Sequence, residues 1–290
     1  MRGVSPEREG TMNLFVETLK AVLFGVVEGI TEWLPISSTG HMILLDEFVR
    51  MQMSDAFMEM FNVVIQLGAI LAVVVLYFPK LWPFKRGEKG KPLSYLKMDT
   101  VMLWIMVVVA IIPSALIGLP LDDWMDEHLH TAPVVAAMLI VYGVAFILFE
   151  RRMGKGKPAR ASDVQQIGVK LALGIGAFQA LSLVPGTSRS GATILGGVLL
   201  GCSRAAASEF SFFMAIPTMA GASLLKLLKF GLDFTGAELL ILGVGCVTAF
   251  VVSVVAIRTF IGYIKRHSFE AFGWYRIALG ALVAAYFLIG

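Results

Sequence analysis

Long apolar segments separated by short polar stretches make up most of this chain. A helix needs roughly 20 predominantly apolar residues to cross the hydrocarbon core of a bilayer. Six segments meet this requirement, at residues 57–77, 101–121, 132–149, 207–228, 239–264 and 272–289. The pattern therefore predicts an all-α polytopic membrane protein.

Two stretches interrupt this pattern with proline, glycine and polar side chains. The first reads EGITEWLPISSTGH from Glu28 to His41, and the second reads QALSLVPGTSRSGAT from Gln179 to Thr193. Their central prolines lie 150 positions apart, which is about half of the chain. Broken backbone at membrane depth is tolerated only where protein buries it or where it lines a wet cavity. Each stretch is therefore predicted to form the turn of a re-entrant helical hairpin.

The composition agrees with a membrane protein. Hydrophobic residues make up 57% of the chain and charged residues only 16%, whereas a soluble domain carries about 25% charged residues. This excludes a soluble protein, and the net charge of +3 gives no reason to expect a nucleic-acid partner. Charges close to the N-terminus argue against a cleavable signal peptide. Cys202 and Cys246 lie in apolar segments and are expected to be packed thiols.

The distribution of charge predicts the orientation. Basic residues cluster in the connections at 79–91, 150–160 and 265–267, whereas the connection at 122–131 is acidic. Short cytoplasmic loops of membrane proteins carry the excess of lysine and arginine. The basic connections are therefore predicted to be cytoplasmic, and the acidic connection and both termini to lie outside.

This alternation gives the two halves of the chain opposite orientations. Span 57–77 runs inward, whereas its counterpart 207–228 runs outward. Each half then contains one re-entrant hairpin followed by three spans, which is an inverted-topology repeat. In such a repeat the two polar turns can meet near the middle of the membrane.

The expected organisation of the chain follows from these orientations. The first repeat is expected at 12–150 and the second at 164–290, with a basic linker at 151–163 between them. Residues 1–11 are expected to form a disordered extension ahead of a second candidate start at Met12.

Glu28 and Glu32 are four positions apart, so on a helix they share one face. A charged side chain in the middle of a membrane helix costs about 2.5–3.5 kcal/mol, so these carboxylates are not expected to face lipid. Mg²⁺ binds through one or two carboxylates together with phosphate oxygens of a substrate. We predict a divalent-cation site here, the alternative being two solvated carboxylates at a helix end.

The second polar stretch has the features of an anion site. A new helix start after its Pro-Gly turn offers free backbone N–H groups and the positive end of the helix dipole, and the Arg189 guanidinium matches phosphate oxygens. The alternative is a structural arginine that is ion-paired or reaches the interface. The candidate phosphate ligands are Gly186, Ser188, Ser190 and Thr193 in this turn and Ser37 and Thr39 in the first, with helix capping as the other role of the hydroxyls.

Ser38 and His41 are three positions apart and would share one side of a helix. Ser38 could attack phosphorus while His41 takes its proton, or His41 could attack directly while Ser38 donates a hydrogen bond. A third route is attack by water at the cation with His41 as base, and His41 could also be only a satisfied interior histidine. A hydroxyl at a helix start favours Ser38. The predicted catalytic set is Glu32, Ser38, His41 and Arg189.

The two stretches resemble the signatures of the undecaprenyl pyrophosphate phosphatase family, which confers bacitracin resistance. The resemblance rests on ExxxE and PxSSTGH in the first stretch and on PGxSRSGAT in the second, and it extends from about Leu14 to the C-terminus. It implies hydrolysis of undecaprenyl pyrophosphate to undecaprenyl phosphate and inorganic phosphate, which recycles the lipid carrier for peptidoglycan synthesis. It also implies a divalent cation, Mg²⁺ or alternatively Ca²⁺, bound by Glu28 and Glu32.

The expected location is the bacterial inner membrane, with the active site open to the outer side. The partners are then the lipid substrate and the bilayer, and a homodimer is an option that the motifs do not decide. A different class of function stays open, because inverted repeats with broken helices are typical of transporters. The chain could flip a phosphorylated polyprenyl lipid with the same residues.

Overall fold

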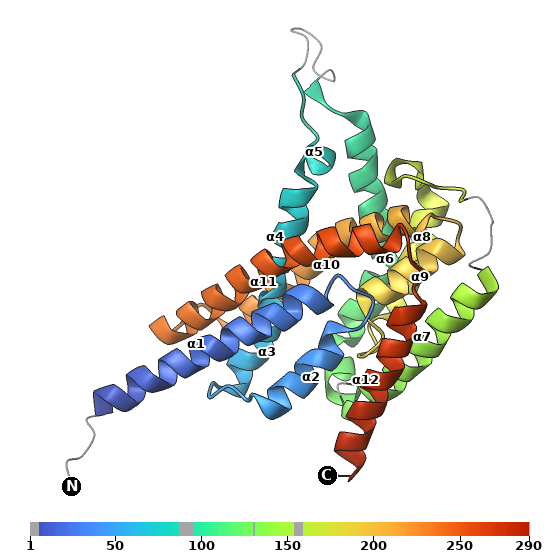
Figure 1. Ribbon diagram of the computed structural model, residues 1–290. Helices are drawn as coiled ribbons and strands as arrows, with labels where there is room; N and C mark the ends of the chain where they lie inside the picture. The colour runs from blue at the N-terminus through green and yellow to red at the C-terminus, as the bar shows by residue number, and fades with distance from the viewer. Residues whose placement is uncertain (1–5, 87–94, 130, 154–158, 290) are drawn as a thin grey trace.

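A computed structural model describes residues 6–86, 95–129, 131–153 and 159–289 of the chain (Figure 1). Within these ranges the chain is almost entirely helical, and its extended pairing is limited to two isolated β-bridges. The helices in order are α1 (Pro6–Thr31), α2 (Ser38–Phe48), α3 (Asp55–Val64), α4 (Gln66–Leu76), α5 (Phe78–Leu81), α6 (Met98–Leu129), α7 (Ala132–Met153), the 3₁₀-helix η2 (Val164–Gln166), α8 (Val169–Leu181), α9 (Arg189–Leu199), α10 (Arg204–Phe230), α11 (Gly236–Ile264) and α12 (Glu270–Ile289).

Five helical segments in the described ranges are long and apolar enough to cross a membrane. They coincide with the first five predicted spans, at Asp55–Leu76, Met98–Leu121, Ala132–Arg152, Arg204–Phe230 and Gly236–Ile264. The chain is therefore a polytopic all-α membrane protein. The sixth predicted span forms α12, which contains a buried arginine, Arg276.

The two polar stretches form the turns of helical hairpins. The first turn joins α1 to α2 and the second joins α8 to α9 (Figure 1). The α1 arm is longer than expected, because α1 begins at Pro6 and residues 6–11, expected to be disordered, are helical. Proline is favourable in the first turn of a helix, and glutamate and arginine are good helix formers, which accounts for this early start. Residues 1–5 lie outside the described residues.

The helices of one half pack against those of the other. α1 packs along α11, α8 packs along α6, and α7 packs along α12. Gly25 and Gly29 make the first of these contacts close: a Cβ on Gly25 would lie 2.7 Å from the Gly245 carbonyl oxygen, and one on Gly29 would lie 2.8 Å from that of Ala249. Two glycines four positions apart on one face of a helix allow this close approach of the two backbones.

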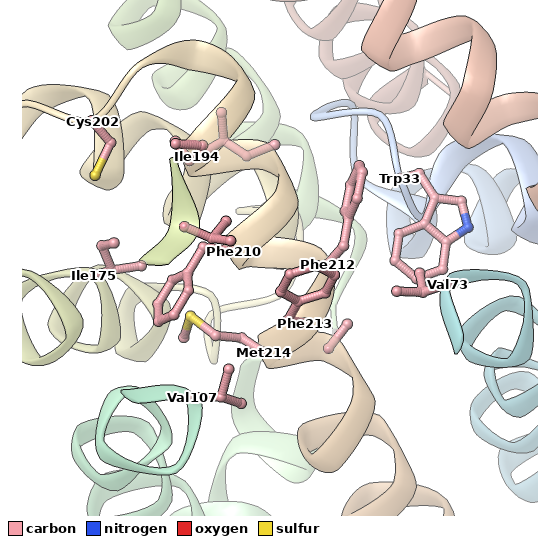
Figure 2. Packing of buried hydrophobic residues seen from close by; sticks show 14 of the residues in the cluster. Trp33, Val73, Val107, Ile175, Ile194, Cys202, Phe210, Phe212, Phe213 and Met214 are labelled. Carbon is pink, nitrogen blue, oxygen red and sulfur yellow. The ribbon is translucent and has the colours of Figure 1, made fainter. Parts of the chain in front are cut away.

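The first polar turn is anchored in the main hydrophobic core. Trp33 lies two residues after the end of α1 and is fully buried, with its indole in a T-shaped arrangement with the Phe212 ring at a centroid distance of 5.1 Å. Figure 2 shows Trp33 beside Val73 and facing the row of α10 side chains that includes Phe213 and Met214. Aromatic pairs of this geometry stabilise a core beyond their buried area. Trp33 therefore anchors the turn against α4 and α10.

Candidate active site

The two polar turns have the same backbone form. Ser37 and Ser188 are the N-caps of α2 and α9, with φ angles of 71° and 72°, and they are the only non-glycine residues with positive φ among those described. The Ser37 Oγ accepts from the Gly40 N–H at 3.3 Å, and the Ser188 Oγ accepts from the Gly191 N–H at 3.1 Å. A non-glycine residue in this region costs on the order of 1–3 kcal/mol and persists where its surroundings hold it. Both serines therefore cap a helix.

Glu32 joins the two turns. Its Oε2 accepts a hydrogen bond from the Ser38 hydroxyl at 2.7 Å, and its Oε1 accepts from Nη2 of Arg189 at 3.0 Å. Glu32 and Arg189 lie 157 positions apart in the chain and form an ion pair that is largely buried. Three of the four predicted catalytic residues therefore form one hydrogen-bonded unit.

The guanidinium of Arg189 is held in a fixed orientation. Its Nη1 donates to the Ser211 carbonyl at 2.8 Å, and the group lies 5.9 Å from the Trp33 ring centre. The Ser211 hydroxyl is in turn 2.7 Å from the hydroxyl of Thr193. Nothing in the sequence around Ser211 distinguishes it from other serines of α10, so its part in orienting Arg189 depends on the fold.

Two of the predicted phosphate ligands use their hydroxyls inside the protein. Ser190 is buried, with its Oγ 3.0 Å from the Glu32 carbonyl and 3.1 Å from the Leu34 carbonyl. Thr193 is also buried and donates to the Arg189 carbonyl at 2.8 Å. Buried hydroxyls are normally hydrogen-bonded, and the bond of Ser190 fastens the second turn to the first.

Glu28 lines a cavity with a volume of about 710 Å³ and has one oxygen that lacks a partner. The residue is 1% exposed, and its Oε1 makes no hydrogen bond. Ser38 and Thr39 line the same cavity, as do Asn62 of α3 and Gln66 of α4. A buried acceptor without a partner is costly unless a ligand or water satisfies it.

Glu28 is the one of the two predicted cation ligands that has an oxygen available for a divalent cation. Both oxygens of Glu32 already accept hydrogen bonds, so Glu28 supplies the available carboxylate oxygen. In the described part of the chain, no group of three histidine, cysteine, aspartate or glutamate side chains is placed to hold a metal. One carboxylate with phosphate oxygens and water is the ligand set that Mg²⁺ commonly takes.

His41 has different partners from those expected. Its Nδ1 lies 2.7 Å from the Ser37 carbonyl and its Nε2 lies 2.7 Å from the hydroxyl of Tyr275 on α12. No hydrogen bond between Ser38 and His41 is found among the described residues, because Ser38 turns toward Glu32 and His41 toward α12. The predicted serine–histidine pair is therefore not formed, although both residues lie in the first turn of α2.

Arg276 is a site residue that the motifs do not reveal. It is fully buried, and its guanidinium donates to the Gly186 carbonyl at 2.8 Å, the Thr187 carbonyl at 2.9 Å and the Pro35 carbonyl at 3.2 Å. Gly186 has a φ of 89°, and a side chain there would meet the backbone of Val135. Arg276 thus fastens both turns together. The signal for it was a lone arginine in a predicted span, since such residues are rare and face the protein interior.

Comparison with known proteins assigns the chain to a family. The family described as bacitracin resistance protein BacA matches residues 21–282. A protein of Enterococcus faecalis named undecaprenyl-diphosphatase is 60% identical over 269 residues, which cover 93% of this chain and 96% of that protein. A protein of the same name from Acetivibrio thermocellus is 58% identical over 273 residues, covering 94% and 98% of the two chains. The chain therefore belongs to the bacitracin resistance protein BacA family.

Proposed function

We propose that this protein hydrolyses undecaprenyl pyrophosphate to undecaprenyl phosphate and inorganic phosphate. The reaction recycles the lipid carrier of peptidoglycan synthesis and removes the form of the lipid that bacitracin sequesters. Two relatives of this protein carry the name undecaprenyl-diphosphatase and match nearly the whole chain. The observation that carries the proposal is Glu32, which bonds both to the Arg189 guanidinium and to the hydroxyl of Ser38, a residue that lines the cavity.

The cavity is suited to the head of the lipid. Its lining includes Glu28, Ser38 and Thr39, and its volume of about 710 Å³ can hold a pyrophosphate with its water. Arg189, with Nε buried and unpartnered and Nη1 and Nη2 already held, is oriented in advance. A donor fixed before the reaction stabilises developing charge on phosphate oxygens without a cost of reorganisation.

Ser38 is the nucleophile that the geometry favours. Its hydroxyl would attack the terminal phosphorus and pass its proton to Glu32 Oε2, while the bond to the bridging oxygen breaks and undecaprenyl phosphate leaves. Water would then cleave the phosphoserine, restoring the hydroxyl and releasing inorganic phosphate. Glu32 rather than His41 is the base in this route, because Glu32 is the residue to which Ser38 donates.

A divalent cation would be held by Glu28 and by oxygens of the substrate. When bound, it would offset the negative charge of the pyrophosphate. The unpartnered Glu28 Oε1 on the cavity wall supports this assignment.

We further propose an inverted-topology repeat in the inner membrane, with the cavity open to the outer side. The matching caps at Ser37 and Ser188 support the repeat. So does the packing between the halves, in which α1 of the first half packs on α11 of the second, and α8 of the second packs on α6 of the first. Glu127 lines the cavity and belongs to the acidic stretch predicted outside. Figure 1 draws the start of α1 and the end of α12 toward one end of the molecule, and α5 toward the other.

Phosphate release by purified protein in detergent tests the proposed function, because a detergent solution has no two sides between which a lipid could be transported. Undecaprenyl pyrophosphate should release inorganic phosphate, and Ser38→Ala and Arg189→Ala should abolish most of that release. Ser162→Ala, in the exposed linker, is the control and should behave as wild type. Wild-type protein that releases no phosphate in detergent, but moves the lipid across vesicle membranes, would establish the transporter alternative instead.

A further inference from the structure

Both ring nitrogens of His41 are engaged, and their partners determine which nitrogen carries the proton. The partner of Nδ1, at 2.7 Å, is the Ser37 carbonyl, which can only accept a hydrogen bond. Nδ1 therefore carries the hydrogen. In the neutral ring Nε2 is then the acceptor, and the Tyr275 hydroxyl at 2.7 Å donates to it.

The Tyr275 ring also packs against the His41 ring. The two rings stack at a centroid distance of 5.6 Å with an interplanar angle of 9°, although 234 positions separate the residues. Tyr275 directly precedes Arg276, whose guanidinium bonds to carbonyls of both polar turns. The register of α12 on the turns thus fixes the Tyr275 hydroxyl relative to the imidazole.

On its other side, the His41 ring contacts Ser37, the N-cap of α2 with a positive φ angle. The Nδ1–H of His41 bonds to the carbonyl of Ser37, the residue with a φ of 71° that directly precedes Ser38. A ring that rotated or exchanged its tautomer would withdraw the donor from this carbonyl. The backbone that presents the Ser38 hydroxyl to Glu32 would then lose one of its restraints.

We propose that Tyr275 is a positioning residue for the reaction. Its hydroxyl holds the His41 ring so that Nδ1–H stays on the Ser37 carbonyl, and the Ser37 cap in turn sets the position of Ser38. This inference rests on the proposed phosphatase function. It adds a residue from the last helix, outside both polar stretches, that acts through His41 and does not touch the substrate.

Kinetics of Tyr275→Phe test the effect on the reaction. The substitution removes only the hydroxyl, and we expect kcat to fall roughly tenfold, as for the loss of one hydrogen bond, with KM nearly unchanged. The matched control is Tyr263→Phe, because Tyr263 stacks on His267 at 4.4 Å while His267 Nδ1 faces a backbone carbonyl and not the phenol. An unchanged kcat, or a loss confined to KM, would overturn the proposal.

Solid-state NMR of the full chain with ¹⁵N-labelled histidine tests the hydrogen bonds without any activity measurement. The chain has four histidines, and a His41→Gln sample identifies the His41 signals. Wild type should show a protonated Nδ1 and a hydrogen-bonded acceptor at Nε2, and Tyr275→Phe should shift Nε2 toward an unbonded acceptor. A protonated Nε2 in wild type would refute the proposal even if phosphate release is confirmed. A preparation that releases no phosphate would instead refute the proposed function.

Discussion

At the scale of single residues, most polar atoms of the charged side chains in the site form hydrogen bonds within the protein. Both carboxylate oxygens of Glu32 accept hydrogen bonds, one from Ser38 and one from Arg189, and Arg276 donates to three backbone carbonyls. An unpaired charge in a buried site is far more costly than a paired one, so each partner depends on the other. Glu28 departs from this arrangement, since one of its buried oxygens has no protein partner.

Replacing Arg189 with lysine should be almost as damaging as replacing it with alanine. The guanidinium reaches the Ser211 carbonyl and the Glu32 carboxylate through different nitrogens, and a single ammonium cannot reproduce that fork. Loss of one oriented donor lowers turnover on the order of 10²–10³-fold. The measurement is kcat/KM for phosphate release, with Arg266→Lys on the exposed α11–α12 connection as the control. Retention of most of the rate by Arg189→Lys would reduce Arg189 to a general source of positive charge.

Removing the Glu28 carboxylate should raise the concentration of divalent cation that the protein requires. Chelator should abolish phosphate release and added Mg²⁺ should restore it, with Glu28→Gln needing more Mg²⁺ than wild type. Direct Mn²⁺ binding, followed by electron paramagnetic resonance, should weaken in parallel. Glu127→Gln is the control at the exposed rim of the same cavity. Full activity of a Glu28→Gln, Glu32→Gln double variant at low metal would argue against a carboxylate site.

Trapping the covalent intermediate identifies the nucleophile. A single turnover with labelled terminal phosphate, quenched with denaturant, should leave the label on Ser38, because the Ser38 hydroxyl is already bonded to a base. Phosphoserine survives acid and is lost in alkali, whereas phosphohistidine behaves in the opposite way. An acid-labile label that persists in Ser38→Ala and is lost in His41→Ala would transfer the role to His41.

The sequence pointed to residues that the structure buries, but it did not give their pairing. Intramembrane charge and motif spacing singled out Glu28, Glu32 and Arg189, because such residues are tolerated only where protein surrounds them, and the structure buries Glu28 and Glu32 and pairs Glu32 with Arg189. The spacing of Ser38 and His41 predicted a pair, but side chains three apart on a short helix can still turn toward different neighbours. Tyr275 and Ser211 could not be predicted, because their contacts arise only when α12 and α10 are docked.

At the scale of helices, hydropathy was a good guide to the spans and a poorer guide to the hairpins. A lipid-facing helix must be apolar nearly all round, so its composition alone reveals it. α1 was not predicted as one long helix, because acidic and basic side chains interrupt its apolar pattern. Glu17 illustrates the reason, since it is buried and bonded to Lys20 and to the Gln52 N–H. The predicted connection at 122–131 is also largely helical, since α6 continues to Leu129.

Adding a methyl group at the α1–α11 contact should destabilise the protein. In Gly29→Ala the new Cβ would lie 2.8 Å from the Ala249 carbonyl oxygen, so the two helices would have to separate. Overpacking of this kind typically costs about 1–3 kcal/mol. Gly243→Ala on α11 is the matched control, because no atom lies within 4 Å of its added Cβ. Thermal unfolding in detergent should show a lower midpoint for Gly29→Ala alone, and equal midpoints for both variants would contradict the contact.

At the scale of the whole molecule, the halves are interlocked. The first arm of each hairpin packs on a span of the opposite half, α1 on α11 and α8 on α6, while α7 and α12 pack on each other. Charges in loops gave an expectation of opposite orientations, but they could not identify which helices touch. Contact partners depend on shape complementarity, and a list of spans does not contain that information. The ion pair between Glu32 and Arg189 exists only because the halves exchange partners in this way.

The orientation of the chain in the membrane can be tested with single cysteines. The background lacks Cys202 and Cys246, and cysteines are introduced one at a time at Thr131, Arg160 and Arg266, all of which are exposed. An impermeant thiol reagent applied to intact cells should label position 131, beside the acidic stretch. It should leave positions 160 and 266 unlabelled until the cells are permeabilised.

The three positions together decide the proposed topology. If the halves run in opposite directions, the connection after α7 and the one after α11 lie on the same cytoplasmic side, although one follows the first half and the other lies within the second. Labelling of position 160 from outside would place the second hairpin on the same side as the first. The polar turns would then approach from one face, and the inverted repeat would have to be abandoned. Labelling of position 131 alone in intact cells would leave the cavity open to the outer side, where Glu127 lines it.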